Sequence, residues 1–115
     1  MEHSHGKAVF EGLAPLTREL RAAIPDVYAG FRDLHGAAMA PGALDTKTKE
    51  LIALALSVLH QCDGCIASHA RGAAKAGATK QEAAEALGVT FLMNGGPATV
   101  YAPRAYDAFC EFADA

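Results

Sequence analysis

The sequence lacks several features that mark particular classes of protein. It has no tryptophan, and its net charge of -3 comes with no basic stripe, so we expect no nucleic-acid partner. The longest nearly unbroken apolar run, residues 51–59, is too short to span a bilayer. The N-terminus does not have the basic-then-apolar layout of a signal peptide. We therefore expect a cytoplasmic protein that does not bind membranes.

Cysteine is scarce, and its number is odd. The chain has three cysteines, two of them three residues apart at Cys62 and Cys65. A secreted domain held by disulfides usually has an even number at wider spacings. In a reducing compartment, this C-x-x-C spacing indicates redox chemistry or metal binding.

The bulk composition is that of one globular domain over residues 1–115, about half of it apolar. Residues 1–8 are expected to be flexible, with His3 and His5 in a frayed tail. Alanine is very common, and its small side chain fills little volume. The core of a single chain would be thin, which favours burial between subunits of a homo-oligomer.

Apolar spacing predicts five or six helices. Pro15 interrupts the first apolar pattern, so that helix is expected to begin there, and Pro25 ends it and opens the next. Later helices are expected after a cap at Asp45 or Thr46, over 63–76, from a capping box at 79–82, and around 101–112. Strand patterns are weak, so the predicted fold class is all-α. The run 51–59 is apolar on all sides, which predicts a central helix or one covered by another subunit.

Cys62 and Cys65 lie at the expected start of a helix. The helix dipole and the unpaired N–H groups there stabilise a thiolate. Two cysteines one turn apart are also within the geometric limits of a disulfide. His69 follows Cys65 by four residues, so the two share a helix face and the imidazole can accept or return the thiol proton.

Glu50 precedes Cys62 by twelve residues, which would be about 18 Å along one continuous helix. A turn near Gln61 would instead form an antiparallel helical hairpin. Glu50 and His69 would then differ by roughly 4 Å along the axis, within reach of a glutamate side chain. Glu50 could orient His69 or pass on its proton.

A zinc site is the alternative for this segment, with His60, Cys62, Cys65 and His69 as ligands. Four ligands within ten residues would form a strained cage, which disfavours it. A second alternative treats the two cysteines as small buried hydrophobic residues.

Other candidate residues have simpler interpretations. His60 is expected to end a helix, His35 to be at or near the surface, and Cys110 to pack in the last helix. Gly95-Gly96-Pro97 follows no strand, so it predicts a helix–helix turn rather than a phosphate loop.

Four stretches, residues 49–55, 62–69, 75–79 and 82–83, resemble the carboxymuconolactone decarboxylase superfamily. The E-x11-C-x2-C-x3-H pattern is most similar to the alkylhydroperoxidase D-like branch, and the similarity covers about residues 25–112. The best-known peroxidases of that branch have a histidine just before the second cysteine of this pattern. This chain has Gly64 at that position.

The resemblance implies an all-helical fold in trimers or hexamers. We expect no cofactor and no bound metal. It implies a dithiol peroxidase in which Cys65 attacks a hydroperoxide and Cys62 resolves the sulfenic acid. His69 and Glu50 would relay protons, and a thioredoxin-like or lipoyl partner would reduce the disulfide.

Two other functions stay open from the sequence. One is a lyase or isomerase of the decarboxylase type, with His69 and Glu50 as acid and base, although that branch usually lacks the cysteine pair. The other is a non-catalytic redox-sensing oligomer.

Overall fold

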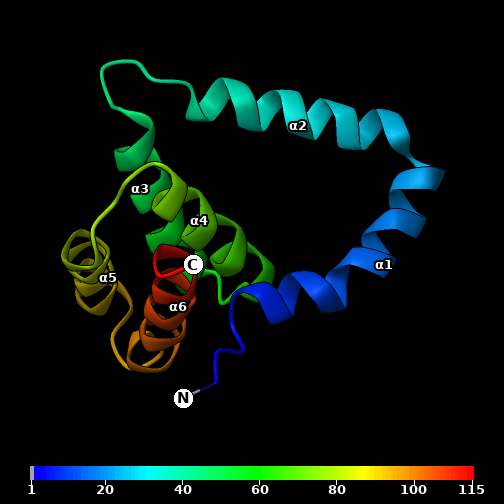
Figure 1. Cartoon of the computed structure of the whole chain (residues 1–115). Helices are drawn as coiled ribbons and strands as arrows, with labels where there is room; N and C mark the ends of the chain where they lie inside the picture. Colours follow the sequence, from blue (N-terminus) through cyan, green and yellow to red (C-terminus); the bar gives the residue numbers. More distant parts are fainter. Residues whose placement is uncertain (1) are drawn as a thin grey trace.

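The computed structural model describes residues 2–115, and this part of the chain forms six helices and no strand (Figure 1). The helices are α1 (Lys7–Ala23), α2 (Pro25–Met39), α3 (Thr46–Leu59), α4 (Asp63–Lys75), α5 (Lys80–Asn94) and α6 (Ala98–Ala113). The predicted all-α fold class is confirmed. Among the described residues, no helix is both long and apolar enough to cross a membrane.

The core lies between α3, α4, α5 and α6, which pack together in Figure 1. Alanines make up most of the contact surfaces, so the helices can approach closely. A few larger side chains fill the remaining space: Leu54, Val58, Ile66, Leu87 and Phe109. This close packing holds α3 against α4, and the candidate site lies on these two helices.

The helix ends in this bundle follow the capping signals in the sequence. The Asp45 carboxylate accepts a hydrogen bond from the Thr48 backbone N–H at 2.7 Å, and a capping box formed by Thr79 and Glu82 begins α5. The backbone N–H of Thr79 and the ammonium of Lys47 lower the pKa of Glu82. Because Lys47 Nζ lies 2.9 Å from Glu82 Oε2, the same glutamate also connects α3 to α5.

Helices α1 and α2 form an arm that extends away from the bundle (Figure 1). None of the described residues of these two helices is buried. The predicted start of the first helix at Pro15 is wrong, because α1 begins at Lys7 and contains Pro15. An exposed helix accommodates an internal proline more easily, since water can bind the carbonyl that loses its N–H partner.

The segment before α1 lies against α6. His3 Nδ1 is 2.8 Å from Asp107 Oδ1, the Lys7 backbone N–H donates to Glu111 at 3.1 Å, and Gly6 is buried. These contacts hold the segment against α6 in the structure, and the flexibility expected for residues 1–8 stays a prediction. Met1 of that segment lies outside the described residues.

The 51–59 segment is not buried on every side within one chain, so it is not the fully enclosed central helix that is one of the two predicted arrangements. The other arrangement, in which another subunit covers this helix, stays a prediction. Glu50, Leu54, Ser57 and Val58 of α3 are buried, but Ile52 is 46% exposed and Leu56 is 51% exposed. The face of α3 that carries Ile52 and Leu56 is therefore an exposed apolar surface of the single chain.

Candidate dithiol and histidine–glutamate site

The turn between α3 and α4 brings the candidate residues together. Gln61 has a φ of +53°, in the left-handed region, and the Cys62 backbone N–H donates to the Ser57 carbonyl at 3.2 Å. The chain reverses at this point, and α4 returns alongside α3. The predicted helical hairpin is thus present in the structure.

Cys62 and Cys65 form a disulfide with a Cα–Cα distance of 5.2 Å. Cys62 is the N-cap residue of α4, and its sulfur accepts a hydrogen bond from the Cys65 backbone N–H at 3.2 Å. After reduction, the same N–H group would stabilise a thiolate on Cys62. The side chain of Cys65 is exposed, whereas that of Cys62 is partly buried. The two sulfurs therefore have different surroundings.

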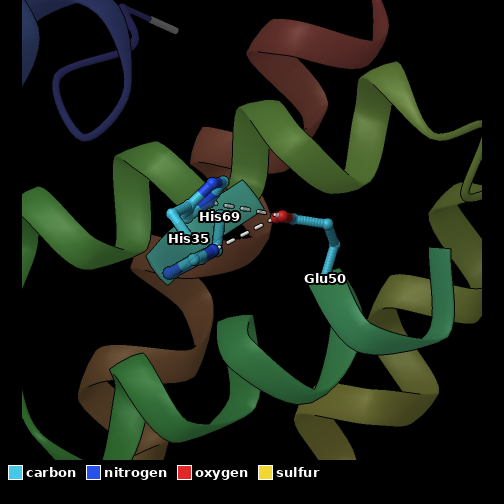
Figure 2. Close-up of side chains that lie close together, drawn as sticks. All are labelled: His35, Glu50 and His69. Carbon is cyan, nitrogen blue, oxygen red and sulfur yellow. Dashed lines mark hydrogen bonds and ion pairs between the residues drawn. The ribbon is translucent and has the colours of Figure 1, made fainter. Parts of the chain in front are cut away.

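Glu50 and His69 are joined across the two helices. Glu50 Oε2 lies 3.1 Å from His69 Nδ1, and the side chains are 5% and 20% exposed (Figure 2). An ionised carboxylate only accepts hydrogen bonds, so Nδ1 of a neutral His69 is the donor. This leaves Nε2 as the basic nitrogen of the ring. A carboxylate in this position fixes both the orientation and the tautomer of the imidazole.

His69 and Cys65 line the same shallow pocket of about 250 Å³. Ala53, Leu56, Ser57 and His60 form the rest of its wall, so the pocket is mostly apolar. A larger cavity of about 660 Å³ lies between α1, α4 and the end of α6, and none of the four predicted site residues lines it. The pocket at Cys65 is the one beside the candidate chemistry.

Gly72, which the sequence analysis did not single out, provides the space for Glu50. A Cβ atom added to Gly72 would overlap the Glu50 carboxyl group. The carboxylate therefore lies directly against the backbone of α4, one turn beyond His69. A glycine in the middle of a predicted helix, facing the neighbouring helix, was the available signal.

His35 also lies at this site, although its sequence position predicted only a histidine at or near the surface. Its Nε2 is 4.0 Å from Glu50 Oε1, and its ring faces that of His69 with a centroid distance of 6.2 Å and an interplanar angle of 19° (Figure 2). Nothing in the spacing of the sequence places α2 beside α3. The contact comes from the path of residues 40–45.

The other candidates do not form the alternative zinc cage. The sulfurs of Cys62 and Cys65 are bonded to each other, and His69 Nδ1 faces Glu50. His60 caps the C-terminal end of α3 and is exposed, and Cys110 is partly buried on α6. Residues 95–97 connect α5 to α6, as the predicted helix–helix turn requires.

A helical bundle with a C-x-x-C disulfide and a histidine–glutamate pair defines a class of small all-α proteins with a redox-capable dithiol. The chain belongs to the carboxymuconolactone decarboxylase family, whose model matches residues 25–108. It is 38% identical to an uncharacterized protein of Cupriavidus necator over 78% of this chain and 80% of that one. It is also 42% identical to an uncharacterized protein of Haemophilus influenzae over 79% and 80%.

Two solved structures of the family resemble the fold closely. A family protein of Legionella pneumophila has a TM-score of 0.87 and 42% identity, covering 93% of this chain and 96% of that one. A family protein of Thermotoga maritima, for which a role in an antioxidative response has been suggested, has a TM-score of 0.74 and 30% identity. That match covers 90% of this chain and 91% of the other.

Proposed function

We propose that this protein is a thiol-dependent peroxidase or disulfide oxidoreductase with a cytoplasmic antioxidant role. The main support is that a buried glutamate orients His69 beside the pocket that Cys65 lines. An activated nucleophile needs this arrangement of a thiol, a base and a group that orients the base. The suggested antioxidative role of the Thermotoga maritima relative is in line with it.

The proposed reaction starts from the reduced dithiol. His69 Nε2 accepts the Cys65 proton, and the thiolate attacks the outer oxygen of a hydroperoxide. The O–O bond breaks, the proton held by His69 passes to the departing alkoxide, and Cys65 becomes a sulfenic acid. The Cys62 thiol then attacks the Cys65 sulfur, forming the disulfide and releasing water. Glu50 stabilises the protonated imidazole during the first step.

The disulfide must then be reduced by a dithiol, and a thioredoxin-like or lipoyl protein is the proposed partner. Cys65 is the more exposed of the two half-cystines. Cys62 is the better leaving group, because the Cys65 backbone N–H lies 3.2 Å from its sulfur. The partner thiolate is therefore proposed to attack Cys65, giving a mixed disulfide at Cys65 and a thiolate at Cys62.

The decisive experiment measures peroxide consumption with a dithiol reductant. We expect Cys65→Ser to lose turnover, whereas Cys110→Ser, which removes the cysteine outside the pair, is expected to retain it. If Cys65→Ser consumes peroxide as fast as the wild type, the proposal is wrong. Activity on a small lactone or keto acid that survives thiol alkylation would indicate the lyase alternative. A slow Cys62–Cys65 disulfide without turnover would indicate a sensor.

We also propose that the chain works as a homo-oligomer. The apolar side chains of the arm are exposed in the single chain: Leu13, Leu16, Leu20, Ile24, Val27, Phe31 and Leu34. So much exposed apolar surface is unusual for a monomer and typical of an interface. The family resemblance favours a trimer or a hexamer.

A further inference from the structure

His35, Glu50 and His69 converge from three consecutive helices, α2, α3 and α4 (Figure 2). One donor atom from each residue lies within 4.8 Å of the other two. The end of α2 is fixed near α3 by two hydrogen bonds, from Thr46 Oγ1 to the Met39 carbonyl at 2.8 Å and from Lys49 Nζ to the Ala40 carbonyl at 2.7 Å. These bonds bring the C-terminal part of α2, which carries His35, close to Glu50.

The negative charge of the Glu50 carboxylate is uncompensated when the imidazoles of His35 and His69 are both neutral. Glu50 is 4% exposed, and among residues 2–115 its ion-pair partners are the two histidines, with no lysine or arginine. Buried carboxylates are normally paired with a cation or bound to a metal. Protonating both facing imidazoles would place two positive charges side by side. A single cation bound between the three side chains would compensate the carboxylate without that repulsion.

The distance between Glu50 and His69 fits a first-row transition metal, and His35 lies a short movement away from such a fit. Zinc–ligand bonds of about 2.0–2.1 Å at tetrahedral angles separate neighbouring ligand atoms by about 3.3 Å. The distance from Glu50 Oε2 to His69 Nδ1 is already 3.1 Å. His35 Nε2, at 4.0 Å from Glu50 Oε1, would have to approach by about 0.7 Å to reach such a separation. The His35 side chain is 46% exposed, so it has room to move, and solvent water can complete the coordination.

We propose that His35, Glu50 and His69 form a binding site for a divalent transition metal such as Zn²⁺. Two imidazole nitrogens and one carboxylate are a ligand set that favours Zn²⁺ and its neighbours over Ca²⁺ or Mg²⁺, which prefer oxygen ligands. The ion is an exchangeable ligand and not a resident cofactor.

Metal binding regulates the dithiol site, a consequence that rests on the proposed function. An ion bound through His69 Nδ1 takes the lone pair of that nitrogen, so the ring proton moves to Nε2. Nε2 is then a donor and no longer accepts the Cys65 proton. The ion also takes Glu50 away from its hydrogen bond with His69. Bound Zn²⁺ therefore inhibits peroxide reduction.

The binding test is independent of turnover. It uses the oxidised full chain carrying His3→Asn, His5→Asn and Cys110→Ser, in which the paired sulfurs and the N-terminal histidines do not compete for metal. We expect one Co²⁺ per chain, with visible absorption bands that Zn²⁺ removes. His35→Asn should weaken binding at least tenfold, and His60→Asn, which changes an exposed histidine outside the cluster, should leave it unchanged. Absence of saturable binding, or equal affinity in His35→Asn, overturns the proposal.

The regulatory test measures the Zn²⁺ concentration that halves the peroxidase rate, with each variant compared with its own metal-free rate. We expect this concentration to rise at least tenfold in His35→Asn. An unchanged value would mean that Zn²⁺ acts through the thiolates and would overturn the regulatory role. Co²⁺ binding without peroxide turnover would support the metal site while contradicting the proposed function. Turnover without Co²⁺ binding would contradict the metal site alone.

Discussion

The position of the Glu50 carboxylate depends on Gly72, a residue that has no side chain. The carboxylate fits against α4 because Gly72 has no Cβ atom. Any larger residue there would force the carboxylate to move, and the contact with His69 would be lost or weakened. Gly72 is therefore a positioning residue for the histidine–glutamate pair.

Gly72→Ala is expected to lower peroxide turnover by roughly ten- to a hundredfold, the usual range when a group that orients a functional histidine is displaced. The disulfide should still form, because the turn at Gln61 is unaffected. Steady-state rates and free-thiol counts check both points. Gly88→Ala is the matched control, since a Cβ atom at Gly88 of α5 meets nothing within 4 Å. A wild-type rate for Gly72→Ala would show that the position of Glu50 is unimportant.

The sulfurs of Cys62 and Cys65 have different surroundings, which gives a second prediction about single residues. Cys62→Ser leaves Cys65 without its resolving thiol. With peroxide present, a small thiol should condense with the Cys65 sulfenic acid and release water, so a mixed disulfide should accumulate on Cys65. In Cys65→Ser, adduct formation on Cys62 should be at least about tenfold slower, because that sulfur is less exposed. Mass spectrometry of the adducts over time measures both rates. Faster labelling of Cys62 would reverse the assignment of the attacked sulfur.

At the start of α3, the charge of the N-cap residue Asp45 makes the stability of the fold depend on pH. The side chain and the backbone N–H of Thr48 donate hydrogen bonds that lower the pKa of Asp45 below its ordinary value of 3.8. A lowered folded-state pKa means that the charged cap stabilises the fold above that ordinary value. This stabilisation is lost as the pH falls through the folded-state pKa.

Asp45→Asn keeps an N-cap side chain but removes the charge. The wild type is expected to have the higher Tm at neutral pH, by a small margin because the carboxylate is exposed. The margin should shrink as the pH falls below 3.8, when the wild-type carboxyl also becomes neutral. Thermal unfolding followed by circular dichroism between neutral and acidic pH tests this. A Tm difference that stays constant over the whole range would contradict it.

The sequence predicts the helices of the bundle and the break between α1 and α2 at Pro25 better than it predicts the start of α1. Caps at Asp45 and Thr79 are local signals, and the offset between Glu50 and His69 follows from the rise per residue in two antiparallel helices. The approach of His35 is not local, since it depends on how residues 40–45 cross from α2 to α3. The predicted start of α1 at Pro15 was wrong because an exposed helix can contain a proline that would disrupt a buried one.

At the scale of the whole molecule, the single chain leaves much apolar surface uncovered. The arm contributes nothing to the buried core, and Ile52 and Leu56 of α3 add to the exposed apolar area. The apolar character of the 51–59 segment predicted burial that one chain does not provide. A second copy of the chain is the proposed cover.

Phe31→Glu tests this assembly. Phe31 is 66% exposed in the single chain, and burying one such side chain contributes about 1.5–3 kcal/mol to association. A charged replacement should therefore weaken each contact by at least about tenfold and shift the protein towards monomers. Size-exclusion chromatography with light scattering over a range of protein concentrations measures the shift. Arg32→Glu is the control, because it changes charge at the next position of α2 without removing apolar area. A wild-type chain that remains monomeric at high concentration, or a Phe31→Glu variant that associates as strongly as the wild type, would show that the arm is not the interface.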